Sequence, residues 1–181
     1  MTPAYGDHDP IAAPATAMGE SALAVIRTSG NCIGLVASVF SKPEKLRKAA
    51  GNTIVHGWIV NPDTGEKIDD VLVSVYRSPR TYTGEDGADI CCHGGVAAVR
   101  AVMETLKKAG FRDALPGEFT FRSFMNGKQD LTRAESVMEI VSAKTGRARE
   151  QAVRRLCGTL EREINGIKNL LVRVLAGGNL S

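Results

Sequence analysis

The sequence lacks any apolar run that approaches the roughly 18 residues needed to cross a bilayer, so we expect no membrane-spanning segment. It also lacks a Gly-x-x-x-x-Gly-Lys-Ser/Thr motif, which excludes a phosphate-cradling loop of that type among these 181 residues. The N-terminus carries Asp7 and Asp9 and no apolar core, so we expect no signal peptide. Together these absences predict a cytoplasmic protein.

Cysteine is scarce, and none of the four residues (Cys32, Cys91, Cys92 and Cys157) forms a Cys-x-x-Cys pair. Only His93 lies near a cysteine in the sequence. This spacing argues against a zinc site, and a cytoplasmic chain argues against a disulfide framework. We interpret the cysteines as buried free thiols.

The composition, with 43% hydrophobic and 24% charged residues, is ordinary for a globular protein. The net charge of +3 is unevenly spread, because residues 131–181 hold nine Lys or Arg and five Asp or Glu. A basic cluster there contains Arg147, Arg149, Arg154 and Arg155. Such a cluster fits both a solvated helix face and a contact with nucleic-acid phosphates, and the sequence leaves both open.

Strand and helix signals intermix up to residue 130, which predicts an α/β or α+β domain over residues 1–130. Residues 1–10 have the composition of a flexible lead. The patterns predict strands at 22–27, 53–60, 70–76, 88–92 and 111–115, and helices at 33–40 and 96–109. Gly110 is the expected end of the second helix.

The pattern changes after Asp130, where apolar residues recur at helical spacing. Residues 131–181 therefore predict the start of a second, helical domain. We expect Asp130 and Thr145 as N-caps, and a second helix over 146–175 that would be roughly 45 Å long. No other segment of the chain is expected to cover its apolar stripe, so we expect it to need another copy or further chain.

Residues 116–131 mix features that an ordinary core segment does not need. Pro116-Gly117 predicts a tight turn, Phe119 and its neighbouring phenylalanines offer flat apolar surface, and several charged groups follow. The mixture is typical of a loop that holds a flat, charged small molecule or a partner surface. A plain turn with a helix cap stays open as the alternative.

This stretch also carries a resemblance to a known family. Pro116-Gly-Glu-Phe-Thr-Phe-Arg-Ser-Phe-Met-Asn-Gly-Lys-Gln-Asp-Leu131 resembles the PGEFT-x-RAFLNGK-x-DL signature of the bacterial tRNA-modifying GTPases of the MnmE or TrmE family. Tyr82-Thr-Gly-Glu-Asp86, followed by Asp89-Ile-Cys-Cys-His-Gly-Gly95, resembles its YTGEDVVEIHCHGG motif. With a similar opening over residues 11–30, the match runs from about residue 8 to about residue 165.

The resemblance implies an α+β fold with a mixed-sheet folate-binding domain, similar to the folate domains of one-carbon enzymes. It implies a bound 5-formyl- or 5,10-methylene-tetrahydrofolate and a homodimer. It further implies that the full-length protein acts together with the flavoprotein MnmG to modify C5 of the wobble uridine of tRNA. GTP, Mg²⁺ and K⁺ would belong to a GTP-binding domain that is absent here, so we expect an N-terminal piece without GTPase activity.

Three residues match positions that the family uses for folate: Arg27, Asp89 and Lys128. Arg27 ends an apolar strand, where a permanent charge needs a partner. Asp89 is surrounded by residues that prefer burial, so its carboxylate needs donors that a pterin ring can supply. The family has Glu at this position, so the shorter Asp89 predicts either a deeper ligand or a weaker contact. Lys128 follows a turn and suits an anionic tail.

Other charged residues of these motifs have two interpretations each. Glu85 and Asp86 either cap a turn or touch the ligand. His93 is either a proton carrier or a structural residue at a strand end. Glu118 and Arg122 are expected to form a salt bridge that shapes the loop.

Two rival functions stay open beside folate binding. The first is a pure dimerisation and interaction module without a small molecule. The second is an RNA-binding module that uses the Arg147–Arg155 cluster. The sequence leaves open which folate species binds and which tRNAs are served.

Overall fold

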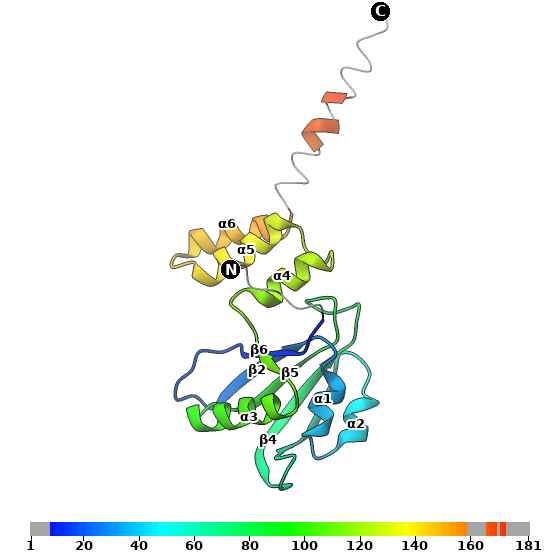
Figure 1. The fold of residues 1–181 in the computed structure, drawn as a ribbon. Coiled ribbons are helices and arrows are strands. Elements are labelled where there is room, and N and C mark those ends of the chain that lie inside the picture. Colours follow the sequence, from blue (N-terminus) through cyan, green and yellow to red (C-terminus); the bar gives the residue numbers. More distant parts are fainter. Residues whose placement is uncertain (1–7, 159–165, 170, 173–181) are drawn as a thin grey trace, which may run out of the picture. The chain divides into compact units, whose positions relative to one another are not determined.

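The computed structural model describes residues 8–158, 166–169 and 171–172 (Figure 1). The chain divides into two compact units, Met1–Lys128 and Gln129–Ser181. No helix within the described ranges has the length and apolar character needed to cross a membrane.

Unit 1 is built around a six-stranded mixed sheet. Its strands are β1 (Ile11–Pro14), β2 (Leu23–Ser29), β3 (Thr53–Val60), β4 (Lys67–Tyr76), β5 (Gly87–His93) and β6 (Arg112–Asp113). They lie in the order β3-β4-β5-β2-β1-β6, and all neighbours are antiparallel except the parallel pair β1–β6. The α+β class with a mixed sheet is thereby confirmed.

Three helices cover one face of this sheet (Figure 1). They are α1 (Ile33–Ser38), α2 (Pro43–Arg47) and α3 (Val96–Lys108). Alternate residues of β4, Val71, Val73 and Val75, point to this face and are buried with Leu46 of α2 and Leu106 of α3. Period-two alternation in the strands and a one-sided stripe on α3 thus produce a single core between the sheet and the helices.

The other face of the sheet carries exposed apolar side chains. Leu23, Ile54 and Leu72 are 62%, 65% and 45% exposed, respectively. They come from β2, β3 and β4, so the exposed positions are spread across three strands. We call this surface the open face.

The strand predicted at 53–60 is confirmed to the residue by β3, and the other predicted strands are confirmed with shifted ends. The strand predicted at 111–115 is much shorter, since only the two residues of β6 pair. β1 and α2 were not predicted. Within residues 116–131 the loop interpretation is wrong for 118–125, because the turn at Gly117 (φ +77°) leads into α4 (Glu118–Met125), as in the alternative of a turn followed by a helix.

Unit 2 contains α5 (Leu131–Ser142) and α6 (Gly146–Leu156). Both predicted N-caps are confirmed. The Asp130 side chain accepts a hydrogen bond from the Arg133 N–H at 2.8 Å, and Thr145 Oγ1 accepts one from the Ala148 N–H at 3.2 Å. These bonds satisfy N–H groups that have no partner within a helix.

The prediction of one helix over 146–175 is wrong at residue 156. α6 ends there, and Gly158 follows with φ +64°. Residues 166–169 and 171–172 are again helical, while the predicted stripe positions at 160, 164 and 174 lie outside the described residues. The stripe of α6 is also partly covered, because α5 contacts α6 and the stripe residue Ala152 is buried. Arg155 of α6 further forms an ion pair with Glu139 of α5 at 2.6 Å.

The prediction of buried thiols is correct for two cysteines. Cys32 and Cys92 are buried, and burial raises the pKa of each to about 11. Cys91 is half-buried and Cys157 is exposed. Cys91 differs from its neighbour because adjacent residues of a strand point to opposite faces of the sheet.

Candidate functional site

A pocket of about 240 Å³ opens in unit 1 where β2, β4 and β5 lie side by side. Its lining combines strand residues with the loop after β4 and the first turn of α4. The lining residues are Arg27, Thr28, Tyr76, Thr81, Tyr82, Thr83, Gly87, Asp89 and Phe119. Two of the three predicted site residues, Arg27 and Asp89, are therefore in the same pocket.

Arg27 and Asp89 face each other across neighbouring strands. They are direct partners in the antiparallel register of β2 and β5. Arg27 Nε donates to Asp89 Oδ1 and Arg27 Nη2 donates to Asp89 Oδ2, both at 2.9 Å. This bidentate contact with the carboxylate raises the pKa of the Arg27 guanidinium. The permanent charge of Arg27, which needs a partner at its place in an apolar strand, is thus paired with Asp89.

Asp89 also receives a hydrogen bond from Tyr76, whose hydroxyl donates to Asp89 Oδ2 at 3.3 Å. A carboxylate offers about four lone-pair positions, and the protein fills three of them here. Burial, followed by the nearby Asp89 charge, raises the pKa of Tyr76. The donors that we expected from a ligand are therefore supplied mainly by the protein, and one acceptor position is left.

Aromatic side chains form one wall of the pocket. The Arg27 guanidinium carbon lies 5.9 Å from the centroid of the Tyr82 ring, within the range of a cation–π contact. The Tyr82 hydroxyl lies 3.1 Å from Thr120 Oγ1 and links the loop after β4 to α4, which also supplies Phe119. The sequence analysis did not select Tyr76 or Tyr82 as site residues, although Tyr82 begins one of the family motifs.

Lys128 is not among the residues that line this pocket. Its Nζ donates to the Pro79 carbonyl at 2.9 Å, and the side chain is exposed. A Cβ at Gly84 would lie 3.3 Å from Lys128 Cγ. Lys128 therefore contacts the same loop after β4 that contributes Thr81, Tyr82 and Thr83 to the pocket.

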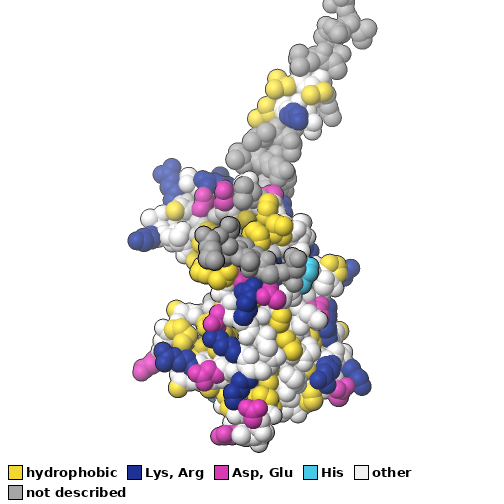
Figure 2. Space-filling view, in the orientation of Figure 1, with side chains coloured by type: hydrophobic (Ala, Val, Ile, Leu, Met, Phe, Trp, Pro, Cys, Tyr) yellow, Lys and Arg dark blue, Asp and Glu magenta, His cyan; other side chains and the backbone are white. Residues whose placement is uncertain are grey.

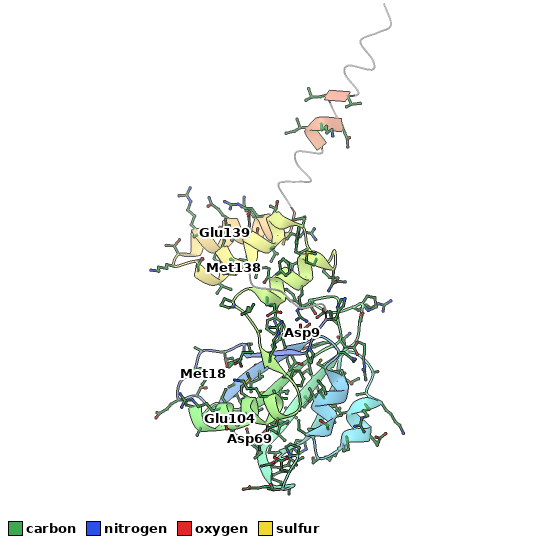
Figure 3. All side chains as sticks on the ribbon, in the orientation of Figure 1. Asp9, Met18, Asp69, Glu104, Met138 and Glu139 are labelled. Carbon is green, nitrogen blue, oxygen red and sulfur yellow. The ribbon has the colours of Figure 1, made fainter. Side chains whose placement is uncertain are left out.

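A charge cluster with a buried centre joins α4 to the sheet, and we call it the buried charge cluster. Glu85, Glu118 and Arg122 form the buried centre, and the partly exposed Asp9 and Arg112 border it. The predicted Glu118–Arg122 salt bridge is confirmed, with Arg122 Nη2 at 2.9 Å from Glu118 Oε1. Arg112 Nη1 donates to Glu118 Oε2 at 2.8 Å. Asp9, labelled in Figure 3, contacts both arginines.

The arginines of this cluster determine the charge state of Glu118, which is fully buried. Burial alone would raise the pKa of Glu118, but hydrogen bonds from Arg112, from the Leu115 N–H and from Arg122 outweigh it and hold the pKa at about 2. Glu118 thus anchors the start of α4 as an ion. Because its carboxylate has these partners, Glu118 can be buried at the start of α4.

Glu85 and Asp86 have structural partners and do not line the pocket. Glu85 Oε2 accepts from Ser29 Oγ at 2.8 Å and from Arg122 Nη1 at 3.1 Å. Asp86 Oδ1 accepts from the Ser78 N–H at 2.8 Å, within the loop after β4. These contacts favour the turn-capping interpretation over ligand contact.

His93 lies at the end of β5 and is tied to Asp69 of β4. Its Nδ1 is 2.6 Å from Asp69 Oδ1, and its N–H donates to Asp69 Oδ2 at 2.9 Å. The hydrogen bond with Asp69 raises the pKa of His93. Asp69 lies well apart from Asp9 within unit 1 (Figure 3). His93 does not line the pocket, and its contacts favour the structural interpretation.

Comparison with known proteins matches residues 10–128 to the family model described as GTP-binding protein TrmE N-terminus. The chain is 49% identical over 177 residues to a tRNA modification GTPase MnmE of Treponema denticola. It is 42% identical over 177 residues to that of Borrelia recurrentis, and 44% identical over 171 residues to that of Carboxydothermus hydrogenoformans.

These alignments cover 97%, 97% and 93% of the chain, respectively. They cover only 38%, 38% and 37% of the relatives. The chain thus spans less than two fifths of the length of these proteins.

Proposed function

Because the chain belongs to the family of GTP-binding protein TrmE N-terminal domains, we propose that it is the N-terminal, folate-binding part of a tRNA modification GTPase. The observation that carries this proposal is the pocket in which Arg27 and Asp89 meet beside aromatic side chains. A carboxylate, a guanidinium and flat apolar walls are the groups that a pterin ring requires.

The chemistry of the pocket fits one end of a tetrahydrofolate. The free acceptor position of Asp89 suits a ring N–H, and the 40% exposed Arg27 side chain can donate to ring acceptors. Phe119 and Tyr82 offer apolar surface for the ring faces. When bound, 5-formyl- or 5,10-methylene-tetrahydrofolate would supply a one-carbon unit.

The volume of the pocket decides which part of the folate it takes. About 240 Å³ is below the roughly 300–1,000 Å³ of sites that enclose a drug-sized ligand. We therefore assign only the pterin end to the pocket. The anionic glutamate tail would remain outside and meet Lys128, which follows α4 and contacts the loop that borders the pocket.

Isothermal titration calorimetry of the 181-residue chain with 5-formyl-tetrahydrofolate tests the proposal. We expect saturable binding that is weakened when Arg27 is replaced by Ala. Absence of heat at millimolar ligand, from protein that is folded by circular dichroism, would contradict folate binding. The same titration with 5,10-methylene-tetrahydrofolate ranks the two species.

The activity of the full-length protein belongs to the same proposal. The relatives are tRNA modification GTPases by name, and we propose that this chain serves such an enzyme together with the flavoprotein MnmG at the wobble uridine. GTP, Mg²⁺ and K⁺ would act in a separate GTP-binding domain. The 181-residue chain has no Gly-x-x-x-x-Gly-Lys-Ser/Thr motif, so we expect no GTP turnover above a heat-inactivated control.

A second candidate function, a pure dimerisation module, is favoured by two observations. Leu23, Ile54 and Leu72 are exposed on the open face, which suits contact with a second copy. Asp89 is also largely satisfied by protein donors. We propose that dimerisation accompanies folate binding, and the calorimetric titration separates the two functions.

Sedimentation velocity tests the dimer. We expect a dimer at tens of micromolar, a monomer for Leu72→Asp, and a dimer after deletion of residues 146–181. A monomeric intact chain would contradict the proposal. A monomer only after the deletion would assign pairing to unit 2.

A further inference from the structure

A second polar surface of unit 1 lies outside the folate pocket, on two segments that the sequence analysis did not select. They are residues 42–52, which contain α2 and the turn after it, and residues 77–80, which follow β4. Together they hold six Lys or Arg residues and one acidic residue, whereas the whole chain has a net charge of +3. Lys and Arg side chains are visible at the place of α2 in Figure 2. We call Lys42, Lys45, Arg47, Lys48, Arg77 and Arg80 the α2 basic surface.

Arg77 holds the two segments together. Its Nη2 donates to the Arg47 carbonyl at 2.7 Å, and its Nε donates to the Ala49 carbonyl at 3.3 Å. Its Nη1 donates to Asp86 at 2.9 Å. A Cβ at Gly51 would lie only 3.3 Å from the Arg77 N and Cβ atoms, so glycine permits this close approach. The contacts of Arg77 therefore fix α2 and its charges relative to the loop that carries Arg80.

Between the two segments lies a hollow of about 290 Å³. It is lined by Gly51, Asn52, Arg77, Ser78, Pro79 and Arg80. Asn52 and Arg80 are exposed at its edge. Guanidinium and amide N–H groups are the donors that phosphate oxygens accept, and the hollow presents no acidic side chain among its lining residues.

Most charges of this surface have no ionic partner. Within the part of the chain that the structure describes, Lys42, Lys45, Lys48 and Arg80 form no ion pair, whereas Arg47 pairs with Glu44 at 2.7 Å and Arg77 with Asp86 at 2.9 Å. In the Arg147–Arg155 cluster on α6, two of the four arginines are paired, Arg154 with Glu150 at 3.0 Å and Arg155 with Glu139 at 2.6 Å. The α2 basic surface thus holds more charges without an ionic partner than the α6 cluster.

From these observations we propose that the α2 basic surface binds the phosphate backbone of an RNA. The identity of the polymer rests on the proposed role in tRNA modification. The hollow receives one phosphate between Arg80 and Asn52, and the lysines of α2 meet neighbouring phosphates. Positive charges that are spread over two segments fit a polyanion better than a single free phosphate, because a free phosphate would leave Lys45 and Lys48 without partners.

The test measures binding of an unmodified tRNA transcript to the 181-residue chain by fluorescence anisotropy, across a range of salt concentrations. The variant Lys48→Gln/Arg80→Gln removes one charge from each segment. Each of the two substitutions should lower the affinity roughly fivefold to tenfold at 0.1 M salt, and the slope of log K against log[salt] should decrease by about two for the double variant. Both side chains are exposed, so we expect unchanged thermal unfolding.

Two matched variants control for charge alone. Arg100→Gln on α3 removes an exposed charge from another helix of unit 1 and should leave affinity unchanged. Arg147→Gln/Arg149→Gln removes two exposed charges from α6 and should have a smaller effect than the surface variant. An equal fall in affinity with Arg100→Gln, or a fall confined to the α6 variant, would overturn the proposal.

Two further outcomes bear on the identity of the partner. A polyglutamate peptide should compete with tRNA only weakly, and competition as strong as that of RNA would assign the surface to an acidic protein instead. Absence of tRNA binding to the unaltered chain would also overturn the proposal. Folate titration of the same preparation keeps the two proposals distinct, since folate binding without RNA binding contradicts only this one.

Discussion

The Arg27–Asp89 pair and the buried charge cluster are both built from arginines and carboxylates, yet water reaches them differently. Glu118 is 0% and Arg122 is 4% exposed. The side chains of Arg27 and Asp89 are 40% and 16% exposed, respectively, and both line the pocket. Glu118 and Arg122 thus lie inside the fold, whereas Asp9 and Arg112 of the same cluster are 37% and 35% exposed, as accessible as the pocket pair.

This difference separates a structural role from the proposed binding role. Glu118 has its two oxygens engaged by Arg112, Arg122 and the Leu115 N–H, so a ligand has no access to it without unfolding α4. Asp89 keeps one acceptor position, and Arg27 keeps an exposed guanidinium. Perturbed charges therefore indicate a binding site only where they also border a pocket.

The largest expected effect comes from breaking the buried cluster. Glu118→Gln removes the buried one of the two carboxylates that Arg112 and Arg122 share, the other being Asp9, so we expect a loss of about 3–5 kcal/mol in the free energy of unfolding. Urea denaturation measures it. Glu44→Gln removes one partner of an exposed pair and should cost less than about 0.5 kcal/mol. A loss below about 1 kcal/mol for Glu118→Gln would contradict the structural role.

Acid should weaken the same cluster. The folded-state pKa of Glu118 is about 2, below its ordinary value of 4.5. Its contribution is therefore fully present above pH 4.5 and is lost as the pH falls toward 2. The contribution at neutral pH is roughly 2–4 kcal/mol. Unfolding measured from about pH 6 to about pH 2 should show this dependence in the unaltered chain, and Glu118→Gln should show a weaker one, which remains because the arginines also lower the pKa of Asp9. Equal pH slopes in both proteins would refute the assignment.

A smaller effect is expected at the pocket, and on affinity rather than on stability. Arg27→Ala should weaken folate binding by roughly 1–3 kcal/mol, the range for losing a hydrogen bond to a charged group. Because Arg27 is partly exposed, the free energy of unfolding should fall by less than about 1 kcal/mol. Calorimetry and urea denaturation measure the two quantities. Arg100→Ala on α3 is the control. If Arg27→Ala lowered the free energy of unfolding as much as Glu118→Gln, the contrast between the pocket pair and the buried charge cluster would be refuted.

The smallest effect is expected from Tyr76→Phe, which removes a 3.3 Å hydrogen bond to Asp89. The change frees a second acceptor position on Asp89 for a ring N–H. We therefore expect folate affinity to stay unchanged or to rise by up to about 1 kcal/mol. A fall of more than about 1 kcal/mol in calorimetry would show instead that Tyr76 holds Asp89 in place for the ligand.

Elements with a strong local pattern were predictable, and short elements were not. Strand 53–60 is rich in β-branched and aromatic residues and coincides with β3, and the caps Asp130 and Thr145 follow from side chains that bond nearby N–H groups. β1 was not predicted, and β6 is shorter than the strand predicted at 111–115; β1 pairs with both β2 and β6, and β6 pairs with β1. The extent of such short strands depends on their pairing partners more than on local sequence.

The sequence by itself determined the α+β class, the family and the pair Arg27 and Asp89 as site candidates, since periodicity and motif spacing are properties of the chain alone. Only the tertiary structure decided that Arg27 is the partner of Asp89, that Glu118 is a buried anchor, and that Lys128 contacts the loop bordering the pocket. The partners of each such pair are up to 62 residues apart along the chain. Which donor satisfies a given carboxylate depends on strand register and helix placement, and these are set by packing of the whole unit.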